Sequence, residues 1–332
     1  MLRKSSLLVA MAAMIMAGGT AVAADWKPER PVEFVVASGA GGGTDNFART
    51  VQKAIAAHKL MDQSIAVLNK GGGSGAEAFI YAKTNAGNPH KLIFGTNNVY
   101  LLPHVTKLGY TTADLTPVAA MALDEFLIWV NAKSDYKDAK SFIDAAKANP
   151  GKIKVAGSQS KDTDQTLVSL IQQVTGAKFT YVPFNGGGAV NVQLVGGHVD
   201  ANVNNPSENI EQWKAGALRP LCVFAPKTLE AGPKIHDGKG WSDIPTCKSA
   251  GIAIDSYEMP RTIWLPAGVP EGAVAYYREL FKKVSETPEW KDYVQRTSQS
   301  GQFLTGAAFD DFRKTDEANA TKVFVAEGWA IK

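Results

Sequence analysis

The stretch that decides the fold is ASGAGGGTD, residues 37–45, in which four glycines fall within five residues. It follows the β-rich run PVEFVVA at residues 31–37. It precedes TDNFARTVQKAIAAHKL, where Phe47, Val51 and Ile55 recur four residues apart and so share one helical face. A strand, a glycine loop and a helix in this order begin an α/β unit. Glycines at this point indicate that the backbone closely approaches an anion or another segment of protein.

The same order of elements recurs along the chain. Strand patterns occur in SIAVLN (64–69), KLIFGTNN (91–98), GKIKVAGS (151–158), KFTYVPF (178–184), VDANVN (199–204) and LRPLCVFA (218–225), with helical patterns between most of them. Repeated strand–loop–helix units imply right-handed crossovers and a mostly parallel sheet. Further helices are expected at 273–284, 288–296 and 309–323, whereas 252–266, which contains Pro260 and Pro266, is expected to be a connection.

In such sheets, ligands bind beyond the carboxyl ends of the strands. The loops at these ends are 38–45, 96–98, 158–162, 184–189 and 204–207. They would line one edge of a single sheet, or two facing edges if the chain forms two sheets.

The N-terminal segment has the pattern of a cleaved signal peptide at residues 1–23. Arg3 and Lys4 precede an apolar core at residues 7–16, and Ala21-Val22-Ala23 is a small-residue cleavage site. The remainder is long enough for two domains and contains no stretch apolar enough to cross a membrane, so a soluble exported protein is expected. A formal net charge of +3 gives no electrostatic case for nucleic-acid binding.

The chain has two cysteines, Cys222 and Cys247. In an oxidising compartment such a pair predicts a disulfide. A catalytic thiol is the alternative, and a metal site would lack further ligands at suitable spacing. No metal or cofactor is expected.

The glycine loops do not match nucleotide or catalytic motifs. GAGGGTD has no lysine before Thr44, as a phosphate loop would require. Residues 71–76 fit G-x-G-x-x-A, but the acidic residue that dinucleotide binding requires is absent at the end of the next strand. Ala76 breaks a nucleophile-elbow pattern around Ser74, and the five histidines lack metal-ligand spacing. We therefore expect a protein that is not an enzyme.

The remaining chemistry is binding of a compact anion such as a carboxylate. GAGGGTD and FNGGGA each open a helix, so each supplies backbone N–H groups backed by a helix N-terminus. Two such sites facing one another would suit an elongated dianion. The alternative is that the glycines serve only tight turns and close helix–strand packing.

Five motifs in order resemble a known family: GAGGGTDNFAR, NKGGGSG, YVPFNGGGAVNVQLVGGHVDANVNNPS, KAGALRPL and LPAGVP. They resemble the TctC-like (Bug) periplasmic substrate-binding proteins of tripartite tricarboxylate transporters. The resemblance implies a two-lobed, type II-like binding protein with an α/β fold in each lobe and two crossovers, near 125–132 and 256–265. Lobe 1 would comprise 24–125 and 262–332, and lobe 2 would comprise 126–261.

The resemblance also implies where the ligand lies. One carboxylate would be held between two loops, partly through backbone N–H groups and water. These loops correspond to Ser38, Gly39, Ala40, Gly41, Gly42, Gly43, Thr44 and Asp45 in one lobe and to Phe184, Asn185, Gly186, Gly187, Gly188 and Ala189 in the other. Further cleft positions correspond to Thr96, Asn97, Ser158, Asn204 and Asn205. The alternative for the strand-end polar residues is a capping or turn role.

The sequence departs from the family pattern at two places. Arg261, in YEMPRTIW, stands where members often carry an aromatic pair; it would either hold a second carboxylate bidentately or form a surface ion pair. Lys161 or Asp162 would alter the choice of ligand. The resulting expectation is a monomeric periplasmic receptor that carries a dicarboxylate or aromatic acid to its permease subunits. The alternatives are a receptor of this fold serving another importer or a sensor, and a secreted hydrolase using Ser74 or Ser38.

Overall fold

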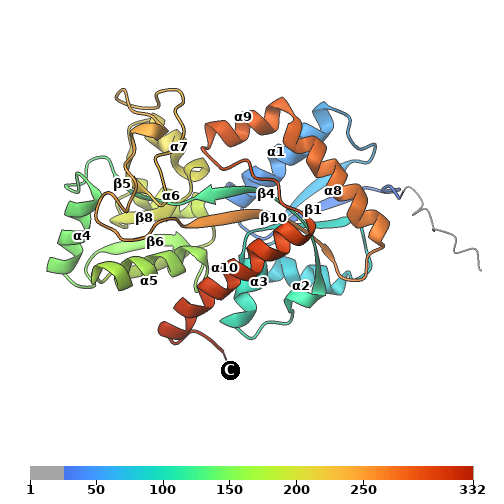
Figure 1. Cartoon of the computed structure of the whole chain (residues 1–332), viewed down its shortest axis with the longest axis horizontal. Helices are drawn as coiled ribbons and strands as arrows, with labels where there is room; N and C mark the ends of the chain where they lie inside the picture. The colour runs from blue at the N-terminus through green and yellow to red at the C-terminus, as the bar shows by residue number, and fades with distance from the viewer. Residues whose placement is uncertain (1–25, 332) are drawn as a thin grey trace, which may run out of the picture.

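The computed structural model describes residues 26–331, so the predicted signal peptide at residues 1–23 lies outside the described residues. The chain forms two five-stranded sheets that lie in two lobes, side by side in Figure 1. Lobe 1 contains the N-terminal and C-terminal segments, and lobe 2 contains the middle of the chain. The predicted two-lobed α/β architecture is confirmed.

The sheet of lobe 1 has the strand order β2-β1-β3-β10-β4. Strand β1 is parallel to β2 and β3, and β10 is antiparallel to β3 and β4, so β10 alone among these five runs the opposite way. The strands are β1 (Val32–Val36), β2 (Ile65–Asn69), β3 (Lys91–Gly95), β4 (Leu115–Glu125) and β10 (Glu258–Pro266).

Helices cover both faces of this sheet. One face packs against α1 (Gly43–Ala57), α8 (Glu271–Glu286) and α9 (Pro288–Arg296). The other packs against α2 (Ala76–Thr84), α3 (Asn98–Leu101) and α10 (Gly306–Ala326). Phe47, Val51 and Ile55 of α1 are buried, which confirms the face predicted from their spacing. Short 3₁₀ turns occur at Leu102–His104, Thr112–Asp114 and Trp241–Asp243.

The sheet of lobe 2 has the order β7-β6-β8-β5-β9, and again one strand, β5, runs opposite to the others. Its strands are β5 (Leu127–Asn131), β6 (Lys154–Ser158), β7 (Thr180–Phe184), β8 (Ala201–Asn204) and β9 (Leu218–Val223). Helices α4 (Ala139–Ala148) and α5 (Thr163–Thr175) cover one face. Helices α6 (Gly187–Val195) and α7 (Pro206–Lys214) cover the other.

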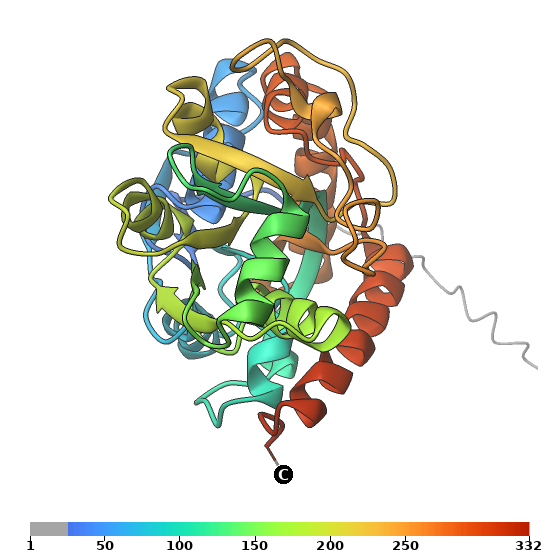
Figure 2. The ribbon, with the colours of Figure 1, turned by 90° about the vertical axis from the view of Figure 1, so that its left-hand side faces the viewer.

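The chain passes between the lobes at the two reversed strands. Strand β4 continues into β5 through Phe126, and the chain returns after β9 to enter β10 at Glu258. In addition, α10 extends from lobe 1 to contact α5 of lobe 2, as Figure 1 and Figure 2 show. Both lobes therefore place the carboxyl ends of their parallel strands at the seam between them.

The expectation that residues 252–266 form only a connection is wrong, because β10 lies inside the sheet between β3 and β4. Strand β10 pairs with β3 only through Thr262, Ile263 and Trp264. Pro260 lies beyond that ladder, so its missing N–H removes no hydrogen bond to β3. Pro266 is the last residue of the strand.

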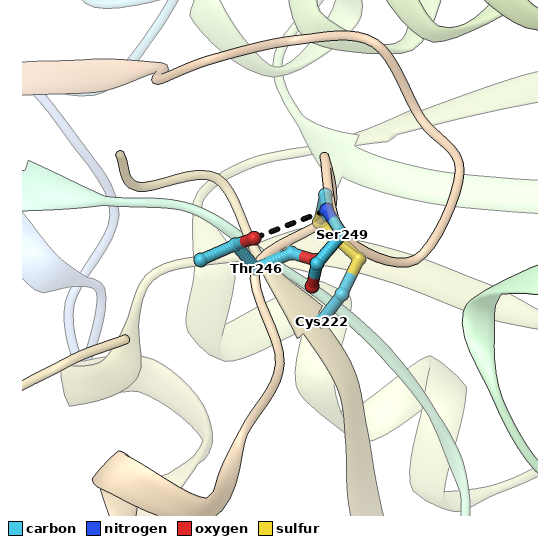
Figure 3. Close-up of a disulfide and its surroundings, with 4 residues drawn as sticks. Cys222, Thr246 and Ser249 are labelled. Carbon is cyan, nitrogen blue, oxygen red and sulfur yellow. Dashed lines mark hydrogen bonds between the residues drawn. A yellow bond between two sulfur atoms is a disulfide. The ribbon is translucent and has the colours of Figure 1, made fainter. Parts of the chain in front are cut away.

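Cys222 and Cys247 form the predicted disulfide (Figure 3). The bond ties the segment after β9 to that strand, next to backbone hydrogen bonds from Val223 to Pro245 (3.0 Å) and from Cys247 to Val223 (2.8 Å). Both cysteines are buried in the core of lobe 2. Among residues 26–331, no helix combines the length and apolar character needed to cross a bilayer.

Candidate functional site

The two glycine loops meet at the seam between the lobes. A Cβ on Gly39 would lie 2.7 Å from the carbonyl oxygen of Asn185, and a Cβ on Gly188 would lie 3.1 Å from that of Gly41. The loop after β1 and the loop after β7 therefore touch through their backbones. Side chains at these glycines would push the two loops apart.

A small cavity of about 30 Å³ lies beside this contact. Ten of the predicted site residues line it, and they come from both lobes: Ser38, Gly42, Gly43, Thr44, Thr96, Ser158, Gly186, Gly187, Asn205 and Arg261. The lining also includes Asn98, Gln159 and Asp162, which belong to loops predicted at this edge. Ala37, Asp164, Glu208 and Met259 line it as well and were not predicted. The backbone contacts between the two loops show that the lobes are closed on one another at this point.

Other predicted residues lie near the cavity but have protein partners. Asp45 accepts from the N–H of Gly41 (3.0 Å) and from Arg49 (3.0 Å). Asn97 donates to Asp316 (3.0 Å), and Asn204 donates to the carbonyl oxygen of Gly187 (3.2 Å). The remaining predicted residues that do not line the cavity are Gly39, Ala40, Gly41, Phe184, Asn185, Gly188 and Ala189.

Two of the helices that open at the seam have a glycine at the N-cap position, Gly42 before α1 and Gly186 before α6. Glycine has no side chain to accept hydrogen bonds from the first N–H groups of a helix, so an external acceptor can take them. Gly186 has a φ of +94°, which favours glycine. The geometry thus provides two helix N-termini for an anion, one from each lobe.

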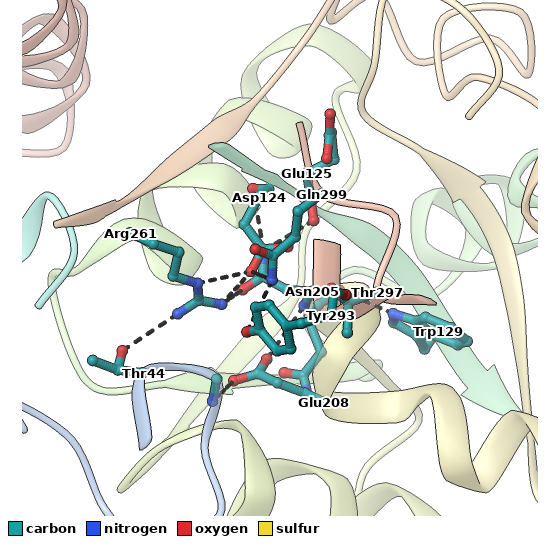
Figure 4. Close-up of polar contacts among 12 residues, drawn as sticks. Thr44, Asp124, Glu125, Trp129, Asn205, Glu208, Arg261, Tyr293, Thr297 and Gln299 are labelled. Carbon is teal, nitrogen blue, oxygen red and sulfur yellow. Dashed lines mark hydrogen bonds and ion pairs between the residues drawn. The ribbon is translucent and has the colours of Figure 1, made fainter. Parts of the chain in front are cut away.

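Arg261 lines the cavity from β10 and is almost fully buried. Its Nε donates to Asp124 at 2.9 Å, and Nη2 is ion-paired with the same carboxylate. Further bonds reach Thr44 and Asn205, each at 3.3 Å (Figure 4). These acceptors take four of the five guanidinium N–H donors. Both side chains of the ion pair are buried, so it lies in the interior and not on the lobe surface.

The charged side chains that line the cavity are mostly acidic. Among the described residues that line it, Arg261 is basic, whereas Asp162, Asp164 and Glu208 are acidic. Burial raises the pKa of Asp162 to about 6, and burial together with the charge of Glu208 raises the pKa of Asp164 well above its usual range. A protonated carboxyl group donates a hydrogen bond, so these two side chains can pair with an anion once they take up a proton.

Two residues that sequence reasoning missed are central to the network. Glu208 spans the seam from α7 to α1, and Asp124 balances the charge of Arg261. The signal at Glu208 was Asn205-Pro206-Ser207-Glu208, which matches a helix capping box and indicates only a helix start. Asp124 lies in the apolar run before residue 131 and carried no motif.

Two larger cavities, of about 550 and 760 Å³, lie elsewhere between the lobes. Neither is lined by the loop after β1 or the loop after β7, so we assign the site to the smaller, closed cavity. Within the described part of the chain, no three His, Cys, Asp or Glu side chains are placed to hold a metal ion.

The chain is similar to known proteins in sequence and in fold. A family model described as “Tripartite tricarboxylate transporter family receptor” matches residues 47–303. Among curated sequences, the “UPF0065 protein in gbd 5'region” of Cupriavidus necator is 28% identical over 313 residues, covering 93% of this chain and 91% of that protein.

Two solved structures from Rhodopseudomonas palustris share the fold. MatC with bound malate has a TM-score of 0.79 at 22% identity, covering 89% of this chain and 99% of that one. Rpa4515 with adipate has a TM-score of 0.81 at 24% identity, covering 91% of this chain and 99% of that one.

Proposed function

Because the chain belongs to the tripartite tricarboxylate transporter family of receptors, we propose that it binds a small organic carboxylate between its lobes in the periplasm and delivers it to a membrane permease. Membership in a receptor family agrees with the expectation that the chain is not an enzyme. We also propose that the receptor acts as a monomer.

The observation that carries the proposal is the meeting of two glycine-capped helix N-termini from different lobes. A carboxylate between α1 and α6 would accept hydrogen bonds from both, and so would favour the closed arrangement over an open one. The closed form would then present a surface made from both lobes to the permease.

The ligand that we propose is a dicarboxylate or an aromatic acid. MatC and Rpa4515, which share the fold, carry malate and adipate. In this chain, Arg261 retains one N–H donor beyond those used by Asp124, Thr44 and Asn205. We propose that this donor serves a second polar group of the ligand.

A thermal-shift screen of mono-, di- and tricarboxylates and aromatic acids tests the ligand class. A ligand present at 100 times its Kd should raise the free energy of unfolding by about 2.7 kcal/mol. The bound acid should be recovered unchanged, whereas turnover of ester substrates would favour a hydrolase. No shift with any acid would contradict the proposal.

Delivery is tested with vesicles that contain a candidate permease of the tripartite tricarboxylate type. Uptake of the identified acid should occur only when the receptor is added. If the receptor binds the acid tightly but uptake does not depend on the receptor, the protein would instead serve another importer or a sensor.

A further inference from the structure

Glu208 makes a connection that a capping residue does not need. It is the third residue of α7, and its Oε2 accepts from the backbone N–H of Asn205 at 3.2 Å, which is one half of a capping box. Its other oxygen, Oε1, accepts from the backbone N–H of Gly43 at 3.0 Å. Gly43 is the first residue of α1 in the other lobe, so one carboxylate joins the two lobes.

The same carboxylate lies against Gly187, the first residue of α6. A Cβ on Gly187 would overlap the Glu208 carboxylate, so only glycine leaves room for it. The carboxylate therefore lies where the N-terminus of α1 meets the start of α6 (Figure 4). This is the position at which the proposed function places the carboxylate of a ligand.

The charges around Glu208 are mixed. The charge of Glu208 contributes to the raised pKa of Arg261, and it also contributes to the raised pKa values of Asp124 and Asp164. Glu208 thus has one cation and two carboxyl groups as neighbours. An anion that binds here would therefore have Arg261, Asp124 and Asp164 as neighbours, with the Glu208 carboxylate close to it as well.

Resting on the proposed function, we propose that Glu208 determines ligand specificity as an internal carboxylate. It occupies the anion position between α1 and α6, and a ligand's carboxylate must displace it from Gly43. A ligand's carboxylate would make the same kind of charge-assisted hydrogen bond to Gly43, and Glu208 competes with it because it is held in place by the chain at a high effective concentration. The displaced Glu208 then selects against ligands that bring only negative charge to this part of the cavity.

The test compares Glu208→Gln with a matched control, Glu211→Gln. Glu211 lies on the same helix, is 65% exposed and pairs with Lys214, outside the seam. The first measurement is the Kd of malate and of adipate by calorimetry. We expect Glu208→Gln to lower the Kd at least tenfold and the control to leave it unchanged. Unchanged or weaker binding in Glu208→Gln would overturn the proposal.

A second measurement is made without ligand. In protein labelled with ¹⁵N-glycine, the Gly43 amide proton should move upfield in Glu208→Gln, because a neutral acceptor replaces a carboxylate, and should stay in place in the control. An unmoved Gly43 resonance would also overturn the proposal. If neither the parent nor any variant binds malate or adipate, these two acids are excluded as ligands of the proposed function. The Gly43 resonance still tests whether the Glu208 carboxylate is bonded to Gly43.

Discussion

Arg261 and Asp124 form an ion pair in which the side chains are 1% and 0% exposed. Asp124 lies near the end of β4, where the chain leaves lobe 1, and Arg261 lies near the start of β10, where the chain returns to it. Gln299 also donates to the Asp124 carboxylate, at 3.3 Å, and Asn205 donates to the carbonyl oxygen of Asp124, at 3.3 Å. The pair therefore joins both crossover strands to lobe 2 and to the C-terminal segment.

We predict that Asp124→Asn lowers the free energy of unfolding by about 3–5 kcal/mol, because it leaves the Arg261 charge buried without a counter-ion. Urea unfolding followed by circular dichroism measures the loss. The double variant Asp124→Leu with Arg261→Met removes both charges and should recover most of the stability. A single variant within about 1 kcal/mol of the parent would show that solvent or other groups compensate the charge.

The pH dependence of stability should reflect Glu125, the last residue of β4. Burial, helped by the charges of Asp124 and Glu258, raises the pKa of Glu125 to about 8. At pH values between the pKa of Glu125 in the unfolded chain and its pKa in the folded protein, Glu125 is protonated in the folded protein and ionised in the unfolded chain. The unfolding free energy therefore falls as pH rises, by about 2 kcal/mol between pH 6 and pH 8.

Glu125→Gln is the control for this titration. It keeps the shape of the side chain and removes its proton equilibrium, so the slope between pH 6 and pH 8 should flatten and the stability at pH 8 should rise. Asp162 and Asp164 also have raised pKa values and should leave a smaller slope. A slope that is unchanged in Glu125→Gln would assign the titration to such other groups.

Gly187→Val tests the proposed anion position between α1 and α6. Its side chain would fill the space that the Glu208 carboxylate occupies and that a ligand's carboxylate would have to enter, so we expect acid binding to be abolished while the far-UV spectrum stays native. Gly232→Ala is a suitable control, because a Cβ there would meet no atom of the described chain within 4 Å. Retained affinity in Gly187→Val would show that the glycines only shape turns.

Much of the fold followed from local patterns. The spacing of Phe47, Val51 and Ile55 predicted the buried face of α1, and the helix 288–296 has the bounds that its pattern indicated. Strand β10 was missed because Pro260 signals a chain break, whereas its tolerance depends on how far the neighbouring strand β3 extends. Sequence spacing contains no information on that length.

The sequence indicated the glycine loops and polar residues that line the cavity, such as Thr96, Ser158 and Arg261, but not the carboxylates that connect them. The glycine loops were found because glycine before a helix has a local meaning. Glu208 and Asp124 were not found because their partners, Gly43 and Arg261, lie 165 and 137 residues away in the sequence. At Glu208 the capping-box pattern supplied a sufficient local explanation and concealed the contact with the other lobe.

The disulfide should stabilise lobe 2 without holding the ligand site. Cys222 and Cys247 are 25 residues apart, and a loop of this length contributes roughly 3 kcal/mol in the chain-entropy model. We expect the double variant Cys222→Ala with Cys247→Ala to lose about that much stability in urea.

Neither cysteine lines the cavity between the glycine loops, so the Kd for an identified acid should stay the same under native conditions. The parent protein treated with a reductant should behave like the double variant. A large loss of affinity in the double variant or in the reduced protein would contradict this expectation. It would mean that the backbone hydrogen bonds of Val223 and Cys247 do not hold the segment after β9 without the disulfide, and that this segment helps to position the ligand site.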